Sequence, residues 1–210
     1  MLRNKKYPIM GLGEVGRGSL AGPIVVGCVF LSKEISVPEQ IVIRDSKQMT
    51  KKQRETTSDW LKKHVIYSLG MSSSEIIDRY GIIKALVLAA QQARNNISLK
   101  IPSIVKNMQI FVDGNQHWFE DDIPIIKGDQ EVSVISMASI IAKVYRDHLV
   151  AKYDHKYPNW QFVNHVGYGT KHHRQMIREN GLIPGLHRKT FCQKILSQAK
   201  NKKKYITKDD

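Results

Sequence analysis

The sequence has little cysteine, few acidic residues and no long apolar run. Its two cysteines, Cys28 and Cys192, are too few for a disulfide framework. The longest apolar stretch, residues 24–31, is the length of a strand and falls well short of the ~18 residues that span a membrane. The basic start of the chain is not followed by the apolar stretch of a signal peptide. We therefore expect no membrane contact and a reducing, cytoplasmic location.

The shortage of acidic residues leaves a strong positive charge. The 210 residues include 33 Lys and Arg against 19 Asp and Glu, which gives a net charge of +14. Residues 166–210 hold 11 basic and 3 acidic side chains, so a net +8 lies in the last fifth of the chain. Such a surface attracts polyphosphates, and nucleic acid is the default partner. A solvated lysine-rich face is the alternative, and charge alone indicates no reaction.

Apolar patterning predicts an α/β domain over residues 1–165 and a small, basic, helical extension over residues 166–210. Because strands come early and helices late, we expect a mixed sheet flanked by helices. Thr50 and Thr170 are predicted helix caps, and Gly181 is a predicted helix end. The predicted strands are residues 8–12, 24–31, 65–71, 109–113 and 123–126, and the predicted helices are residues 51–64, 82–90, 136–153, 171–179 and 191–200.

Residues 11–16 match the pattern G-x-G-x-x-G, but we reject a dinucleotide site. That site needs a helix directly after the glycines to receive the pyrophosphate. Here Gly22 and Pro23 intervene and the next predicted strand begins at Ile24. Two interpretations remain open: backbone N–H groups that approach a sugar or phosphate closely, or a tight connection between strands.

Asp147 stands out because it falls in an apolar stripe. On a helix from residue 136 it shares a face with Ile140 and Val144. A buried carboxylate needs a partner, a raised pKa or a metal ion, because leaving it unpaired costs several kcal/mol or more. An ion pair with Lys143 or Arg146 is the structural alternative, and the pattern alone leaves the choice open.

Three carboxylates lie on separate predicted elements: Glu14 beside the first strand, Asp113 at a strand end, and Asp147 on a helix. Converging carboxylates suit Mg²⁺ or Mn²⁺, which prefer oxygen ligands and can activate water for phosphodiester hydrolysis. A turn role for Asp113 is the alternative. No Cys/His spacing predicts zinc, and His172 and His173 are interpreted as surface residues that can contact phosphate.

Seven short segments resemble bacterial ribonuclease HII, and they follow one another in that family's order. Together they cover the chain from about Ile9 to Phe191. Any one of them alone is a weak signal, but seven in order are highly specific. The segments are residues 13–23, 45–47, 113–114, 127–129, 138–147, 167–170 and 187–191.

The resemblance implies a ribonuclease H-like fold and a metal-dependent endoribonuclease. The implied substrates are RNA–DNA hybrids and duplex DNA with embedded ribonucleotides, cut on the 5′ side of the ribonucleotide, and we expect the chain to act as a monomer. The family uses four acidic metal ligands with Mg²⁺ or Mn²⁺ as the ion, and Glu14, Asp113 and Asp147 of this chain match three of them. The implied substrate-binding residues are Gly16, Arg17, Gly18, Lys47 and Tyr168, which would read the 2′-hydroxyl, approach the backbone and stack on the junction sugar.

The resemblance fails at one ligand, because Gly13 stands where the family has its first aspartate. Glycine offers no side-chain oxygen, so we expect weaker metal binding and impaired cleavage. The chain is then an inactivated variant, a degenerate homologue, or an enzyme that uses Asp45 or water instead. A protein that binds RNA–DNA junctions without cutting them is the alternative function. Val166, where the family often has lysine, is a smaller departure.

Overall fold

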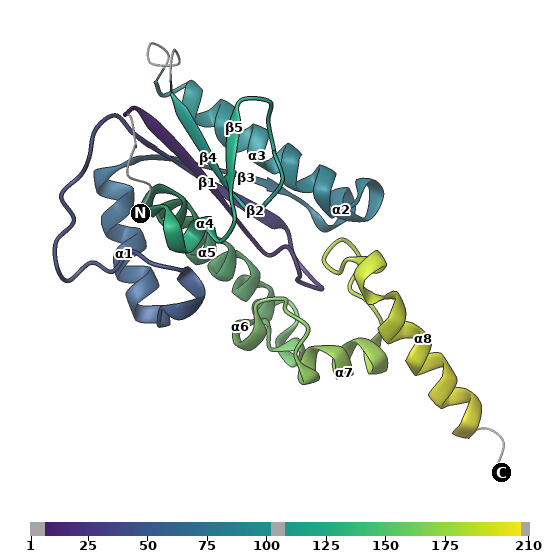
Figure 1. Ribbon diagram of the computed structural model, residues 1–210. Coiled ribbons are helices and arrows are strands. Elements are labelled where there is room, and N and C mark those ends of the chain that lie inside the picture. The colour runs from purple at the N-terminus through teal and green to yellow at the C-terminus, as the bar shows by residue number, and fades with distance from the viewer. Residues whose placement is uncertain (1–6, 102–107, 207–210) are drawn as a thin grey trace.

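The computed structural model describes residues 7–101 and 108–206, with side chains as far as residue 198. Within these residues, the core is one five-stranded sheet in the order β3-β2-β1-β4-β5 (Figure 1). β1 pairs antiparallel with β2 and parallel with β4, so the sheet is mixed as predicted. The strands are β1 (Ile9–Val15), β2 (Ile24–Leu31), β3 (Ile66–Ser72), β4 (Gln109–Asp113) and β5 (Asp122–Ile125).

Helices cover both faces of the sheet because its strands alternate between two apolar cores. Leu12 and Cys28 belong to the core that α3 completes, whereas Val29 and Leu31 belong to the core that α5 completes. The helices are α1 (Lys51–His64), α2 (Ser74–Tyr80), α3 (Ile82–Ser98), α4 (Gly128–Glu131), α5 (Ser133–Ala151), α6 (Phe162–His165), α7 (Lys171–Asn180) and α8 (Lys189–Ile206). Short 3₁₀ helices span Ser46–Gln48, Lys152–His155 and Pro158–Trp160.

Local signals set several helix ends. The Thr50 hydroxyl accepts the N–H of Gln53, whose side chain accepts the N–H of Thr50, so α1 begins with a capping box. Thr170 caps α7, and Gly181 follows its last turn with a positive φ of 77°. α5 begins three residues before its predicted start, and α8 runs from Lys189 rather than from residue 191.

α5 lies unusually close to β1 and β2 because glycines face it. A Cβ atom at Gly27 would lie 2.2 Å from the carbonyl oxygen of Ala138, and one at Gly11 would lie 2.6 Å from Val134. A larger residue at either position would push the helix off the sheet. The close seating brings Ser139, in the middle of α5, against the end of β1 at Gly13.

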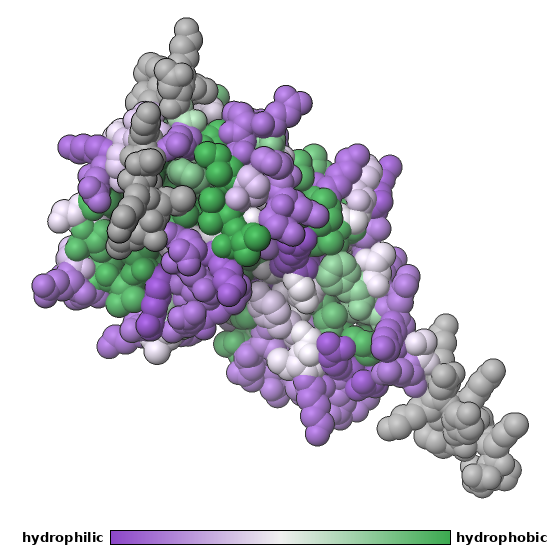
Figure 2. Space-filling view, in the orientation of Figure 1, coloured by the Kyte–Doolittle hydropathy of each residue, from purple (hydrophilic) through white to green (hydrophobic). Residues whose placement is uncertain are grey.

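The basic extension packs around an apolar cluster of its own, away from the sheet (Figure 1). Trp160, Phe162 and Ile177 are buried there together with Leu20 and Val150. Residues before 166 thus share this cluster, and a division of the chain at residue 165 stays a prediction. Figure 2 shows hydrophilic side chains over much of the visible surface. In the described part of the chain, no helix is long and apolar enough to cross a membrane.

Candidate active site

Glu14 and Asp113 lie at the same edge of the sheet. β1 and β4 are parallel neighbours, so their carboxyl ends meet, and Asp113 is the last residue of β4. One carboxylate oxygen of Asp113 accepts the N–H of Gly128, 2.9 Å away, at the start of α4. This contact places Asp129, the next residue, beside Asp113, whose charge also acts on Glu14. Such a strand edge is where open α/β sheets bind ligands.

The sequence patterns indicate no role for Asp129, although its segment, residues 127–129, carries part of the resemblance. Its side chain is buried and lies 3.6 Å from the ammonium of Lys47. The signal for Asp129 is the one that indicated Asp113: a carboxylate soon after an apolar strand. The short extended run of residues 123–126 is visible in the sequence, but the left-handed backbone at Lys127, which turns the chain back toward Asp113, is not.

The charge of Asp113 disfavours ionisation of both Glu14 and Asp129. Burial and the charge of Asp113 raise the pKa of Glu14 to about 7, although Arg17 lies 3.9 Å from it. Burial also raises the pKa of Asp113, and burial with the charges of Asp113 and Asp45 raises that of Asp129. A divalent cation would relieve this repulsion, and its preferred ligands are carboxylate oxygens, so the donor chemistry fits. Across the described residues, no three Asp, Glu, His or Cys side chains already surround a single ion position.

Gly13 contributes no ligand, and Ser139 fills part of the space beside it. A Cβ atom at residue 13 would lie 2.0 Å from the Ser139 hydroxyl oxygen and 3.2 Å from the carbonyl oxygen of Ile135. A side chain here must first turn that hydroxyl away. Asp45 is already engaged, since its oxygens accept the N–H of Lys47 at 2.9 Å and the side-chain amide of Gln130 at 3.3 Å.

A cavity of about 450 Å³ joins the acidic residues to the predicted substrate-binding residues. Its lining combines the carboxylates of Glu14 and Asp129 with basic side chains and one aromatic ring. It contains all five predicted substrate-binding residues: Gly16, Arg17, Gly18, Lys47 and Tyr168. Ser46, Arg54, Ser139 and Lys143 complete the polar part of the lining. The cavity can receive a phosphodiester, because carboxylates and cationic side chains line it together.

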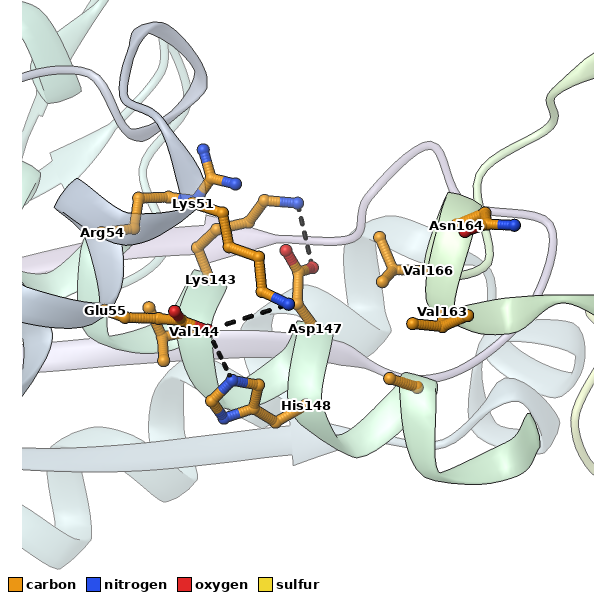
Figure 3. Close-up of a pocket in the computed structure, with 11 residues that line it drawn as sticks. Lys51, Arg54, Glu55, Lys143, Val144, Asp147, His148, Val163, Asn164 and Val166 are labelled. Carbon is orange, nitrogen blue, oxygen red and sulfur yellow. Dashed lines mark hydrogen bonds and ion pairs between the residues drawn. The ribbon is translucent and has the colours of Figure 1, made fainter. Parts of the chain in front are cut away.

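Asp147 lines a different cavity, of about 230 Å³, where α1, α5 and α6 meet (Figure 3). Its carboxylate accepts a hydrogen bond from the Lys143 ammonium at 2.9 Å, which is the ion pair left open by the sequence. Glu55 lies 3.0 Å from His148 in the same cavity. Arg54 and Lys143 line both cavities, so Asp147 reaches the larger one through Lys143.

Comparison with known proteins settles the family. The family model described as Ribonuclease HII matches residues 10–194. The chain belongs to the ribonuclease HII family. Ribonuclease HII of Fusobacterium nucleatum is 39% identical over 199 residues, which are 93% of this chain and 91% of that protein. The Thermotoga maritima protein is 41% identical over 194 residues, covering 90% of this chain and 76% of that protein.

Solved structures confirm the ribonuclease H-like fold. Ribonuclease H2 from Pyrococcus horikoshii OT3 has a TM-score of 0.65 at 23% identity, covering 91% of this chain and 98% of that one. Bst-RNase HIII in complex with Mn²⁺ has a TM-score of 0.66 at 17% identity, covering 92% and 70% of the two chains. At these identities the likeness concerns the fold.

In this ribonuclease HII chain, two buried arginines hold the glycine-rich loop against the extension. The side chains of Arg146 and Arg188 are fully buried and donate to main-chain carbonyls at 2.9 to 3.1 Å. Burial lowers the pKa of Arg188 to about 9. The acceptors are the carbonyls of Arg17, Ala21, Gly22, Pro23 and Val166. The sequence could not reveal these bonds, because donor and acceptor lie up to 171 residues apart.

The prediction that His172 and His173 are surface residues is wrong for His173. That side chain is fully buried, because the inner face of α7 packs on Trp160 and Phe162. Burial lowers its pKa to about 3, so it is neutral and cannot attract phosphate. The two adjacent histidines therefore face different surroundings, which a helix imposes on consecutive residues.

Proposed function

We infer that this chain is an endoribonuclease that acts on RNA–DNA hybrids and on duplex DNA with embedded ribonucleotides. Family membership supports the reaction class. The proposal rests mainly on one cavity, which brings two carboxylates together with basic and aromatic side chains. These residues are Glu14, Asp129, Arg17, Lys47 and Tyr168. The carboxylates suit a metal-assisted attack on phosphorus, and the cations suit the flanking phosphates.

Glu14, Asp113 and Asp129 are the ligands proposed for Mg²⁺ or Mn²⁺. When bound, such an ion activates water and stabilises the leaving oxygen of a phosphodiester. The protein's own part is to hold the carboxylates together: β1 and β4 supply two, and the bond from Gly128 to Asp113 sets the third. The fold neighbour solved with Mn²⁺ supports a divalent ion, and the choice between the two ions belongs to the proposal.

We propose a supporting role for Asp147 in place of the metal-ligand and catalytic role that the resemblance implies. Asp147 orients Lys143, whose ammonium lies 5.1 Å from the centre of the Tyr168 ring. Tyr168 is proposed to stack on the sugar at the RNA–DNA junction. The backbone of residues 16–18 is proposed to read the 2′-hydroxyl, which distinguishes RNA from DNA. Lys47 approaches the substrate backbone.

Gly13 leaves the carboxylate cluster one ligand short, so cleavage is proposed to be impaired. The second candidate function, binding junctions without cutting, is favoured by the same residue. The basic extension would hold the duplex in either case. A monomeric state and a cytoplasmic location remain predictions from the sequence.

The deciding experiment is cleavage of a DNA duplex that carries one ribonucleotide, in Mg²⁺ and in Mn²⁺. Gly13→Asp should raise the rate by about 100-fold or more, since a positioned ion supplies several kcal/mol. Gly13→Asn is the matched control, because it displaces the Ser139 hydroxyl equally but adds no charge. Equal rates for both folded variants would show that the metal assignment is wrong. Ribonucleotide-specific binding with no product from any of them would establish the binding function.

A further inference from the structure

Three buried histidines lie beneath Tyr168. They come from separate segments: His165 ends α6, His173 is in α7, and His187 precedes α8. Their exposed fractions are only 5%, 0% and 2%. The rings of His165 and His173 stack with centres 4.2 Å apart and planes 14° from parallel. The cleavage chemistry proposed above uses none of them.

Hydrogen-bond partners fix where each proton lies in a chain that leads to Tyr168. The N–H of Ile183 donates to Nδ1 of His187 at 2.8 Å, so His187 carries its proton on Nε2. Nε2 of His187 lies 3.0 Å from Nε2 of His173, which therefore accepts. His173 then carries its proton on Nδ1 and donates it to the carbonyl of Tyr168 at 2.9 Å.

His165 completes the support from the other side. The Tyr168 N–H donates to the main-chain carbonyl of His165 at 2.8 Å. The His165 ring accepts the N–H of Gly167 at 3.2 Å and lies 2.8 Å from the Trp160 carbonyl, to which it donates. Both main-chain polar groups of Tyr168 are thus bonded to histidines.

Only neutral imidazoles can form this chain. A second proton on His173 would set two N–H groups against each other between His173 and His187. Burial, with a smaller effect of the neighbouring His165, lowers the pKa of His173 to about 3 and that of His187 to about 4. Asp154 acts on His165 in the opposite direction, but burial outweighs it and the pKa of His165 is also lowered. The hydrogen bonds that run from His187 through His173 to Tyr168 are therefore intact at neutral pH.

We propose that His173, held by His187, is a positioning residue that fixes the main chain of Tyr168 and so aims its ring at the junction sugar. The proposal rests on the substrate class inferred above and adds a specificity-determining group to it. His173 itself is buried below the cavity and touches no substrate. The N–H of Thr170 also donates to the Tyr168 carbonyl at 2.9 Å, so loss of His173 should alter the aim of the ring without releasing the turn.

Two substitutions of His173 separate positioning from folding. Asparagine places an amide donor where Nδ1 stands, so His173→Asn keeps the bond to Tyr168. Glutamine reaches the place of Nε2, so His173→Gln keeps an acceptor for His187 and loses that bond. Affinity is measured at fixed salt for two duplexes that differ by a single ribonucleotide, with Tyr168→Ala and the double variant Tyr168→Ala/His173→Gln alongside.

The parent and His173→Asn should prefer the ribonucleotide duplex equally. In His173→Gln the preference should fall about tenfold, as in Tyr168→Ala, with less than a twofold change on all-DNA duplex. The double variant should lose no more than Tyr168→Ala, because both changes remove one effect. Equal preferences for the asparagine and glutamine variants, or equal losses on both duplexes, would overturn the proposal.

A measurement without substrate tests the chain of protons directly. Nitrogen-15 NMR of the imidazoles at pH 7 should show His173 protonated on Nδ1 and His187 on Nε2. The opposite tautomer of His173 would overturn the positioning role whatever the affinities. If the parent shows the predicted tautomers but does not prefer the ribonucleotide duplex, the proposed function is wrong, and the inference fails with it.

Discussion

Glu14 and Asp129 of the carboxylate cluster line the same cavity as Tyr168, below which the histidine chain is buried, yet the two regions are built in opposite ways. The carboxylates repel one another, and their pKa values are raised. The histidines are neutral, with each ring nitrogen that the chain uses bonded to a partner. The carboxylates thus keep negative charge that an ion can neutralise, whereas the hydrogen bonds of the histidines make their region rigid.

The hydrogen-bonded region, which includes the buried Arg188 next to His187, should be the harder one to alter without unfolding the protein. Arg188→Met removes the guanidinium that donates to the carbonyls of Gly22 and Arg17, and leaves them buried without that partner. We expect a loss of about 3–5 kcal/mol in the free energy of unfolding, measured with urea. Arg178→Met, on the exposed side of α7, should change it by about 0.5 kcal/mol or less. Similar losses in both variants would show that the buried bonds have no special weight.

In the carboxylate cluster, the substitution that matters should be at Asp129. Asp129→Asn removes a proposed ligand, so Mn²⁺ affinity and any residual cleavage should fall about 100-fold. Asp147→Asn leaves the ligands in place and frees only Lys143, so Mn²⁺ affinity should stay within about threefold. Calorimetric titration with Mn²⁺ measures both variants. The reverse ranking would restore Asp147 as a metal ligand and remove Asp129.

Sequence reasoning reached the parts of the site that depend on neighbours in the chain. Thr50 and Thr170 cap helices as predicted, and the apolar runs before Glu14 and Asp113 place both carboxylates at strand ends. It did not reach Asp129, which depends on a four-residue strand and a left-handed turn.

The buried partners were out of reach for a different reason. The sequence indicates Arg146 only as a partner for the adjacent Asp147, because local spacing reveals only near neighbours. Its guanidinium instead donates to the carbonyls of Ala21 and Pro23, more than 120 residues away. His173 likewise bonds to His187, which a separate segment supplies. Long-range pairing of this kind follows from the packed fold and leaves no local pattern.

The contributions of the histidines and of Glu14 to the free energy of unfolding should also change with pH in opposite directions. His173 and His187 have pKa values of about 3 and 4 when folded, below the usual 6.5, so the unfolded chain binds more protons in acid. Their contribution to the free energy of unfolding is complete above pH 6.5. It should fall by up to about 1.4 kcal/mol per pH unit for each histidine as the pH drops toward 4. Glu14 has a raised pKa of about 7, so its contribution is present below 4.5 and is lost as the pH rises through 7.

Unfolding curves in urea with EDTA, taken from pH 4 to pH 8, separate these contributions. His173→Asn should flatten the fall on the acid side, and Glu14→Gln should flatten the fall toward pH 8. Asp59→Asn, on the exposed face of α1, should leave the shape of the profile unchanged. Profiles of the His173 and Glu14 variants that run parallel to the parent would refute the assigned pKa directions.

The smallest expected effect concerns Val166, two residues before Tyr168. Its backbone is left-handed, with φ of 40° and ψ of 41°, which a β-branched side chain adopts at a cost of about 1–2 kcal/mol. The conformation persists because Arg146 donates to the Val166 carbonyl at 2.9 Å and the Val166 N–H donates to Phe162 at 2.7 Å. Val166→Asn should therefore raise the free energy of unfolding by about 1 kcal/mol, since asparagine tolerates this region.

Val163→Asn is the control for this change, because Val163 is exposed and its backbone is helical. It should give no gain in the same urea titration. Ribonucleotide preference should be the same in Val166→Asn as in the parent, because the bonds to Tyr168 come from His165 and His173 rather than from residue 166. A stabilised Val166→Asn with a lower preference would mean that the strain at Val166, and not the histidines, sets the aim of the ring.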